Sequence, residues 1–468
     1  MATDAVASAR PAGALRRVLV PLALAQFICS FAGSNMNVMI NDISRDLNTT
    51  VRGVQLSITL FLLVMAALMI PAGKLTDRFG RKRCFQAGLI VYGVGALLCA
   101  VAPGLGVLIL GNSILEGIGT ALLIPPVYIL ATLLFTEVTS RARAFGMISA
   151  MGGVGAAAGP LIGGLITTAI SWRAAFVFQA LVIVVIVWLG RAIEDPLPAD
   201  PERPFDARGA VLSAAGLILV VGGILLADDN AWVALALGLA GAGVLALFFR
   251  VVRRKEQAGE EPLLSTRLFA NRTSNLGLIT QNVQWMVLLG VSFVVSAFLQ
   301  VVRGYNAIET GVIFTAATVG LLVSSLAAER LARRRPQRTL IEAGFLVTVV
   351  GICVLLAVVS MTEGGPWSFV PGLLIIGLGI GVMLTPSVNI VQSAFGEDEQ
   401  GEISGLSRSV SNLGSAMGTA IAGTIIVAGI AETPELSYAL AMIVLALAAL
   451  VGLVAAQRLP HAQAREPR

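Results

Sequence analysis

Apolar runs long enough to cross a lipid bilayer fill most of this chain, and they restrict the folds open to it. One α-helical crossing needs about 20 apolar residues, because a helix rises about 1.5 Å per residue through about 30 Å of hydrocarbon. The 468-residue sequence holds fourteen such runs. They lie at about 17–41, 53–74, 84–103, 106–135, 144–169, 174–191, 208–228, 231–250, 275–302, 311–330, 340–361, 367–394, 402–429 and 437–457. We therefore predict an all-α membrane protein with fourteen transmembrane helices.

The composition supports a membrane protein and excludes several other classes. Only 13% of the residues are charged and the mean hydropathy is +0.87, whereas soluble domains carry about 25% charged residues. The 50 glycines favour closely packed helices over a β-barrel. There is no Walker loop, and the four cysteines and one histidine have no metal-ligand spacing. We predict no cofactor, no metal and no enzymatic activity.

The basic residues predict the orientation in the membrane. Four arginines lie in loops on one side, and apart from Arg408, which lies inside a span, the other basic residues lie on the opposite side. Those four are Arg45, Arg52, Arg173 and Arg303. The positive-inside rule then places both termini in the cytoplasm, with 1–16 as a cytoplasmic segment and not a cleaved signal peptide. The net charge of +5 follows from these loops and does not indicate nucleic-acid binding.

A charged stretch between the second and third spans carries the most specific motif. It reads G-K-L-T-D-R-F-G-R-K-R over Gly73–Arg83. This resembles the signature loop of the major facilitator superfamily (MFS), which implies two six-helix halves and alternating access around a midplane site. By this resemblance the motif residues form a cytoplasmic latch in which Asp77 pairs with arginines of the next cytoplasmic loop. The predicted latch residues are Gly73, Asp77, Arg78, Gly80, Arg81, Arg141 and Arg143.

The number of spans points to one branch of that superfamily. Two helices lie between charged linkers, and without them six spans remain on each side. This resembles the fourteen-helix drug:proton antiporter branch. We predict a cytoplasmic N-terminus (1–16), an N-terminal half (17–191), a linker with two inserted helices (192–274), a C-terminal half (275–457) and a cytoplasmic tail (458–468).

The fifth span carries a second motif. Its sequence matches G-x-x-x-G-P-x-x-G-G, which is associated with antiporters of the superfamily. The matching residues are Gly155, Gly159, Pro160, Gly163 and Gly164. Glycines at this spacing form a smooth face for a neighbouring helix, and a proline weakens the helix locally. Plain helix packing would use the same residues, so the motif favours an exporter without requiring one.

Glu116 lies in the middle of the fourth span. Ionisable groups at that depth are costly and usually functional, so we predict that Glu116 carries protons. The segment resembles the R-x-x-Q-G-x-G motif of the family, but Ser113 replaces the arginine and Glu116 the glutamine. The role of that arginine therefore cannot be carried over, and a structural, hydrogen-bonded Glu116 remains the alternative.

Uncharged polar residues within spans are candidates for the wall of a substrate cavity. In the first span Ser34, Asn37 and Asn41 continue a polar stripe, while Ala32 replaces an aspartate expected in this branch. Further candidates from other spans are Asn112, Gln281, Gln284, Trp285, Asn389, Gln392, Arg408 and Asn412. Arg408 could pair with Glu116, bind an anionic group or extend to the membrane surface. Helix–helix hydrogen bonding is the alternative for many of these residues.

We therefore predict proton-coupled export of a small amphipathic compound by a monomer in a bacterial plasma membrane. The predicted partners are a small-molecule substrate, protons and the lipid bilayer. A proton-independent carrier is an alternative, because the first-span aspartate and the fourth-span arginine are absent. A flippase for lipids or lipid-linked metabolites is another, and a membrane sensor or scaffold with a carrier fold is a third. A central cavity would argue against the third alternative.

Overall fold

The computed structural model describes residues 12–135, 138–196, 198–202, 204–332, 334–360, 365–396 and 399–460. Throughout these ranges the regular elements are helices. The first part of the chain forms α1 (Ala12–Asn35), η1 (Met36–Met39), α2 (Ile40–Asp46), α3 (Val51–Phe79), α4 (Arg81–Ala100), α5 (Leu105–Leu108), η2 (Ile109–Glu116), α6 (Gly117–Leu134), α7 (Val138–Ala169) and α8 (Trp172–Gly190).

The remaining elements include the two inserted helices and a second group of six spans. They are α9 (Ala207–Leu225), α10 (Ala231–Gln257), η3 (Thr266–Phe269), α11 (Arg272–Ala297), η4 (Phe298–Val302), α12 (Ala307–Leu331), α13 (Gln337–Ser360), η5 (Pro366–Phe369), α14 (Val370–Gln392), α15 (Gln400–Gly429) and α16 (Pro434–Gln457). Within the described ranges, 14 helical segments are long and apolar enough to cross a membrane. The predicted all-α, fourteen-span fold is thus confirmed.

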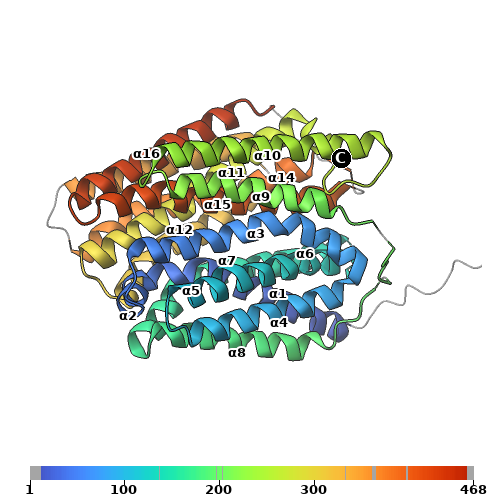
Figure 1. Ribbon diagram of the computed structural model, residues 1–468, viewed down its shortest axis with the longest axis horizontal. Coiled ribbons are helices and arrows are strands. Elements are labelled where there is room, and N and C mark those ends of the chain that lie inside the picture. Colours follow the sequence, from blue (N-terminus) through green and yellow to red (C-terminus); the bar gives the residue numbers. More distant parts are fainter. Residues whose placement is uncertain are drawn as a thin grey trace, which may run out of the picture.

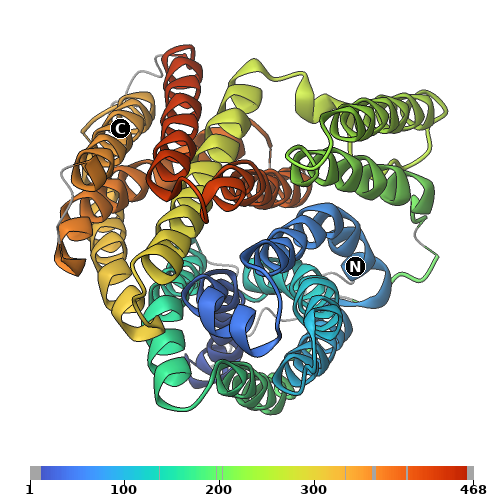
Figure 2. The same ribbon diagram turned by 60° about the vertical axis from the view of Figure 1, so that its left-hand side comes forward.

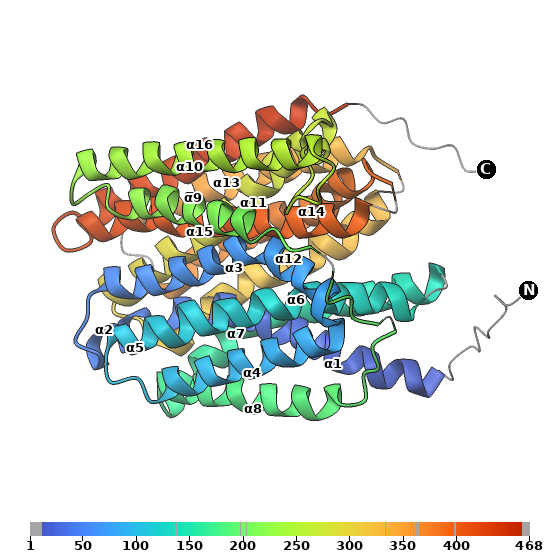
Figure 3. The same ribbon diagram turned by 45° about the vertical axis from the view of Figure 1, so that its right-hand side comes forward.

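The spans form two bundles that lie side by side. Helices α1–α8 pack together, drawn from blue to green in Figure 2, and α11–α16 form the yellow-to-red bundle. The bundles meet along two seams, α3 against α15 and α7 against α12. Both described ends of the chain lie at the same end of the molecule (Figure 3). We call this the termini end, and we call the end with the α2–α3 turn the far end.

The inserted helices α9 and α10 pack against each other and lie beside one seam. Helix α9 contacts both α3 and α15, and the pair runs along the top of the molecule in Figure 1. At the far end the Arg52 guanidinium donates to Asp229 Oδ1 at 2.6 Å and to Asp228 Oδ1 at 2.8 Å. At the termini end Lys255 Nζ lies 3.0 Å from Asp206 Oδ1. The Arg52 pairs attach the α9–α10 turn to α3, and the Lys255 pair joins α9 and α10 to each other.

Short polar residues define where several spans begin. A side-chain oxygen at a helix N-cap accepts a hydrogen bond from a backbone N–H that has no partner inside the helix. Six spans start in this way, with the caps Thr50, Ser171, Asp206, Asn230, Asn271 and Asn306. The cap at α12 is a complete capping box, because Glu309 also accepts from the Asn306 backbone N–H at 2.9 Å. These caps allow tight turns between long apolar helices.

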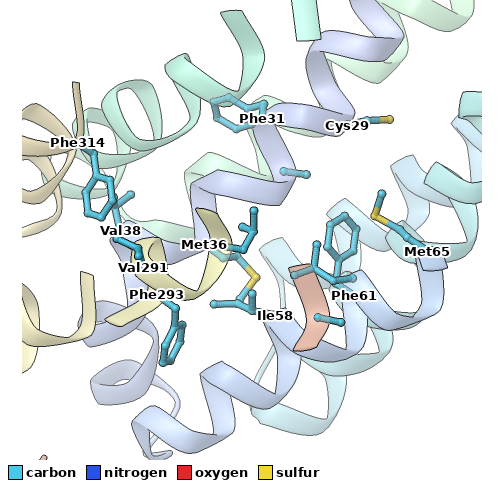
Figure 4. Close-up of a cluster of buried hydrophobic side chains, with 14 of the residues drawn as sticks. Cys29, Phe31, Met36, Val38, Ile58, Phe61, Met65, Val291, Phe293 and Phe314 are labelled. Carbon is cyan, nitrogen blue, oxygen red and sulfur yellow. The ribbon is translucent and has the colours of Figure 1, made fainter. Parts of the chain in front are cut away.

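Large apolar side chains fill the contact between the two bundles. Figure 4 shows Met36 and Ile58 in the middle of the cluster, with Phe61 and Met65 of α3 on one side and Val291 and Phe293 of α11 on the other. Phe293 and Phe314 of the second bundle are 0% and 6% exposed. Dispersion contacts of this kind hold transmembrane helices together where water is absent.

Candidate functional site: a central cavity

A cavity of about 190 Å³ lies between the two bundles near the middle of their helices. Apolar side chains from both bundles form most of its wall, including Phe61, Met65, Met69, Leu289 and Phe314. Polar groups are concentrated on α1 and α15. A largely apolar pocket with a few polar groups is typical of a site for an amphipathic small molecule.

Five of the predicted cavity residues line this cavity. They are Ser34, Asn37, Trp285, Arg408 and Asn412. Asn37 is 4% exposed and its Oδ1 atom has no hydrogen-bond partner. The Asn412 Nδ2 atom also has none. Both residues line the cavity, but these two atoms have no accessible surface there, so a bound molecule would reach them only after a side-chain rotation.

The other six predicted cavity residues lie elsewhere. Asn41 follows the η1 break, and its backbone N–H donates to Gln300 Oε1 at 3.2 Å. Asn112 donates to Ser57 Oγ at 3.2 Å, inside the first bundle. The sequence prediction assumed the same number of residues per turn along each span. Because η1 is a 3-10 helix and η2 is a π-helix, that number changes, and these two side chains face other directions than expected.

The remaining four belong to the second bundle. Gln281 Oε1 accepts from Ser407 Oγ at 2.7 Å in the α11–α15 contact, and Gln284 is 1% exposed with both amide atoms unpartnered. Asn389 and Gln392 line a separate shallow pocket near the α14–α15 turn. Gln281 thus contributes to the α11–α15 contact, and Gln284 is buried away from the cavity.

Several polar residues at or beside the cavity were not predicted, including Gln26 and Tyr128. Gln26 lines the cavity, and its Nε2 atom donates to Ser30 Oγ at 3.1 Å. It lies four residues before Ser30, so it continues the polar stripe of α1 and could have been found from the sequence. Tyr128 of α6 was also missed; its hydroxyl donates to Gln26 Oε1 at 3.3 Å.

Arg408 connects the two bundles through Tyr128. Its Nη2 atom donates to the Tyr128 hydroxyl at 2.5 Å. The guanidinium carbon also lies 5.3 Å from the centroid of the tyrosine ring, within the range of a cation–π contact. Arg408 is thus held at the cavity by a neutral group of the opposite bundle.

Glu116 is fully buried behind the cavity wall. It ends the π-helix η2, is 0% exposed, and neither carboxyl oxygen has a hydrogen-bond partner. The Tyr92 hydroxyl lies beside it and donates to Gln179 Oε1 at 2.5 Å. Cys29, which interacts with Thr120 one turn after Glu116, lines the cavity. Glu116 is therefore separated from the cavity by a thin layer of side chains.

The glycine motif of α7 packs against both bundles. A β-carbon at Gly155, Gly159 or Gly163 would clash with α1. A β-carbon at Gly164 would instead clash with the Ala307 carbonyl of α12, and one at Gly311 would clash with the Pro160 carbonyl. The motif thus brings α7 close to α1 on one face and to the opposite bundle on the other.

Neutral hydrogen bonds join the two bundles on the far side of the cavity. Gln300 Nε2 donates to the Asn37 carbonyl at 2.7 Å, and Ser296 Oγ donates to the same oxygen. Gln55 Nε2 donates to the Thr419 carbonyl at 3.1 Å. Together with the α7–α12 contact, these bonds close the far end.

Ion pairs join the bundles at the termini end. Lys74 Nζ lies 2.7 Å from Glu402 Oε1 of α15 and 3.1 Å from Glu261 Oε1, which precedes η3. The sequence motif contains Lys74, but no role was predicted for it. Lys74 thus contacts the first turn of α15 in the second bundle and the segment between α10 and η3 at once.

The other residues of the signature stretch contact their own bundle and the linker that follows α8. Asp77 pairs with Arg81 at 3.0 Å, and Gly80 has a φ of +92°, which glycine adopts without strain. The Lys82 backbone N–H donates to Asp195 Oδ2 at 3.2 Å. Of the predicted partners of Asp77, Arg143 is exposed, and the side chain of Arg141 lies outside the described residues. Gly73 has room for a β-carbon, and the Arg78 guanidinium lies over the Phe79 ring.

Two helical bundles around a midplane cavity define a membrane transporter that works by alternating access. Comparison with protein families agrees: the Major Facilitator Superfamily model matches residues 22–419. The chain belongs to this superfamily, and it is a multi-pass membrane transporter and not an enzyme.

Several characterised relatives are similar over most of their length. The puromycin resistance protein pur8 of Streptomyces alboniger is 30% identical over 87% of this chain and 81% of its own. The probable actinorhodin transporter of Streptomyces coelicolor is 30% identical over 84% of this chain and 69% of its own. A crystal structure of the peptide transporter POT has the same fold, with a TM-score of 0.69, 16% identity and 95% of both chains covered.

Proposed function

We propose that this protein exports small amphipathic compounds from a bacterial cytoplasm in exchange for protons. The observation that carries the proposal is the largely apolar cavity between the two bundles. The names of the relatives, which include a puromycin resistance protein and an actinorhodin transporter, support export of small compounds. The cavity also argues against a sealed sensor or scaffold.

The two ends of the cavity supply the contacts that alternating access requires. In this state Gln300, Gln55 and the α7–α12 glycines hold the far end closed. These contacts must break when the far end opens. At the opposite end, the Lys74–Glu402 ion pair joins the bundles. The substrate would thus be reached from one side of the membrane at a time.

Glu116 is the proposed proton site. A buried ionised carboxylate is costly unless donors or a cation compensate it, and here both oxygens lack a partner. When Glu116 loses its proton it must recruit donors, and the hydroxyls of Tyr92 and Thr120 are close. Helix α4 is in close contact with the segment around Glu116: Gly95 lies against the Glu116 backbone, and Gly119 lies against Tyr92. Such a rearrangement would therefore change how α4 and α6 pack.

The proton role can be tested in proteoliposomes with an imposed pH gradient. The probes are the dye rhodamine 110, which has a free carboxylate, and its methyl ester, rhodamine 123. We expect Glu116→Gln to lower gradient-driven transport at least about tenfold, because removing an acid–base group typically costs this much or more. Dye binding should remain, and Glu116→Asp should retain part of the rate.

A matched control replaces an exposed carboxylate. Glu432 lies in the turn between α15 and α16 and is exposed, so Glu432→Gln should transport at the wild-type rate. Equal gradient-driven rates for wild type and Glu116→Gln would exclude Glu116 as the proton site. A wild-type rate that does not respond to the gradient would favour a proton-independent carrier.

The orientation and assembly are part of the same proposal. The excess of basic residues near the termini end favours a cytoplasmic location for both termini. The boundaries 17–191 and 275–457 would then delimit two cavity-forming halves, and a monomer in the bacterial plasma membrane contains the whole cavity. Labelling of single introduced cysteines by an impermeant reagent in intact cells tests this orientation.

A further inference from the structure

We propose that Arg408 and Asn412 form a receptor for an acid group, so that the transported compounds are amphipathic organic acids. The acid would be a carboxylate, a sulfonate or a phenolate joined to an apolar body. This inference rests on the proposed export of small compounds and adds a substrate class to it. Three observations support the inference: the charge of Arg408, its hydrogen-bond partner Tyr128, and its position in the cavity wall.

The charge of Arg408 is not neutralised by a carboxylate among the described residues. Six other cations of the described structure have one. The ion pairs are Arg52 with Asp228 and Asp229, Lys74 with Glu261 and Glu402, Arg81 with Asp77, Arg173 with Asp46, Lys255 with Asp206, and Arg338 with Glu342. Arg408 instead has the phenol group of Tyr128. A guanidinium remains charged at any physiological pH, so the cavity holds a permanent positive charge.

A second donor lies beside the guanidinium. Asn412 is one helical turn after Arg408 on α15, and residues at this spacing lie on the same face. Its Nδ2 atom is shielded from solvent and has no partner. A carboxylate accepts several hydrogen bonds, so it can satisfy the guanidinium and, once the Asn412 side chain rotates toward the cavity, this amide as well.

The surroundings fit the rest of such a molecule. Met65, Met69, Leu289 and Phe314 line the same cavity and offer an apolar surface. A compound with an acid group at Arg408 and an apolar body against these side chains matches the wall at both positions. A permanent cation, by contrast, would meet the guanidinium charge in a medium of low dielectric constant.

The structure disfavours the two other roles considered for Arg408. Glu116 lies behind the wall and makes no ion pair with it, so Glu116 is not its counter-ion here. The arginine does not extend to the membrane surface either, because the bond to Tyr128 holds it at the cavity.

Binding of an acid group also has a structural consequence. Tyr128 belongs to α6 and Arg408 to α15, so their hydrogen bond joins the two bundles. A charged acceptor binds a guanidinium more strongly than a phenol oxygen does. The bound acid would therefore displace Tyr128 and remove one contact between the bundles when the cavity is loaded.

The experiment measures binding and transport of the matched dye pair. Rhodamine 110 and rhodamine 123 differ only in that the carboxylate of the first is a methyl ester in the second. Fluorescence anisotropy with the full-length protein in nanodiscs gives both dissociation constants, and proteoliposomes give both transport rates. We expect wild type to prefer the free acid by about 10- to 100-fold, the usual range for a charged hydrogen bond.

Variants separate an acid receptor from a structural role. Arg408→Gln should weaken binding of the free acid by about 10- to 100-fold, and it should not weaken binding of the ester, whose cationic ring system the guanidinium repels. Arg408→Lys retains the charge and should keep part of the preference. Arg250 of α10 is exposed and far from the cavity wall, so Arg250→Gln should behave as wild type.

Each outcome decides one of the two proposals. Equal affinity of wild type for acid and ester, with both transported, would overturn the acid receptor and leave export of amphipathic compounds standing. An equal loss of both dyes in Arg408→Gln would also overturn it, since a structural role predicts that result. Failure of wild type to bind or transport either dye would contradict the proposed export function itself.

Discussion

The two ends of the cavity are closed by different chemistry. At the far end the bundles meet through neutral hydrogen bonds to backbone carbonyls and through glycines in direct contact with the opposite backbone. At the termini end they meet through Lys74, whose side chain is 16% exposed, and two carboxylates that are each 32% exposed. One closure depends on shape and the other depends on charge.

This difference determines how each end can be opened. A close backbone contact in a dry interface tolerates no added atom, since overpacking costs about 1–3 kcal/mol. A partly exposed ion pair contributes about 1 kcal/mol or less and is screened by salt. The far end should therefore be sensitive to single carbon atoms, and the termini end to charge and ionic strength.

The largest effect is expected from Gly311→Ala. The added β-carbon would clash with the Pro160 carbonyl and push α12 away from α7. A cost of about 1–3 kcal/mol shifts the open-to-closed ratio of the far end by about 5- to 150-fold. Spin labels at Val101→Cys and Leu436→Cys, with the exposed Cys353 replaced by alanine, would report the widening.

The control for this variant is an alanine at an open position. A β-carbon at Gly146 of α7 would meet no atom within 4 Å. Because alanine favours helices over glycine, Gly146→Ala should leave the spin-label distance unchanged and stability equal or higher. If Gly311→Ala also left the distance unchanged, closure of the far end by shape would be refuted.

A smaller effect is expected from Lys74→Gln. The change removes both ion pairs and leaves Glu261 and Glu402 without this cation. A loss of about 1 kcal/mol should change the transport rate about three- to tenfold at low salt, and less in 1 M salt. The double variant Lys74→Glu with Glu402→Lys should restore part of the rate. Rates equal to wild type at low salt would mean that charge does not close this end.

The smallest effect is expected from Asp77→Asn. Its carboxylate pairs with Arg81 of the same bundle, and its backbone oxygen accepts from the Asp200 N–H at 3.4 Å. We expect transport to fall less than about fivefold, because the pair is partly exposed. The amount of protein in the membrane should match wild type. A wild-type transport rate would exclude any role of Asp77 in the latch.

The sequence was sufficient for the fold because a bilayer imposes simple rules. Runs of apolar residues marked all fourteen spans, since a backbone in hydrocarbon must form helices. The signature stretch indicated the superfamily, and the family match over residues 22–419 agrees. The broken helices were not foreseen. Neither η1 nor η2 contains a proline, and the Gly111-Asn112-Ser113 run of η2 is the one local signal of an irregular turn in these two segments.

The site was less predictable because it depends on which face of each helix meets the cavity. Ser34 and Arg408 lie at the cavity as expected, whereas Asn112 lies in the π-helix and faces Ser57. Contacts between bundles, such as Arg408 with Tyr128, join residues 280 positions apart. Spacing along one helix cannot reveal such pairs.

The position of α9 and α10 affects how a lipophilic compound would enter. Helix α9 touches both α3 and α15, so it covers the seam where those two helices meet. The α7–α12 seam has no such cover from the inserted pair. A compound dissolved in the bilayer can therefore approach the protein at two different seams. The inserted helices cover the α3–α15 seam and leave the α7–α12 seam uncovered. The rate at which the compound enters from the bilayer should then differ between the two seams, so lateral entry would be asymmetric around the protein.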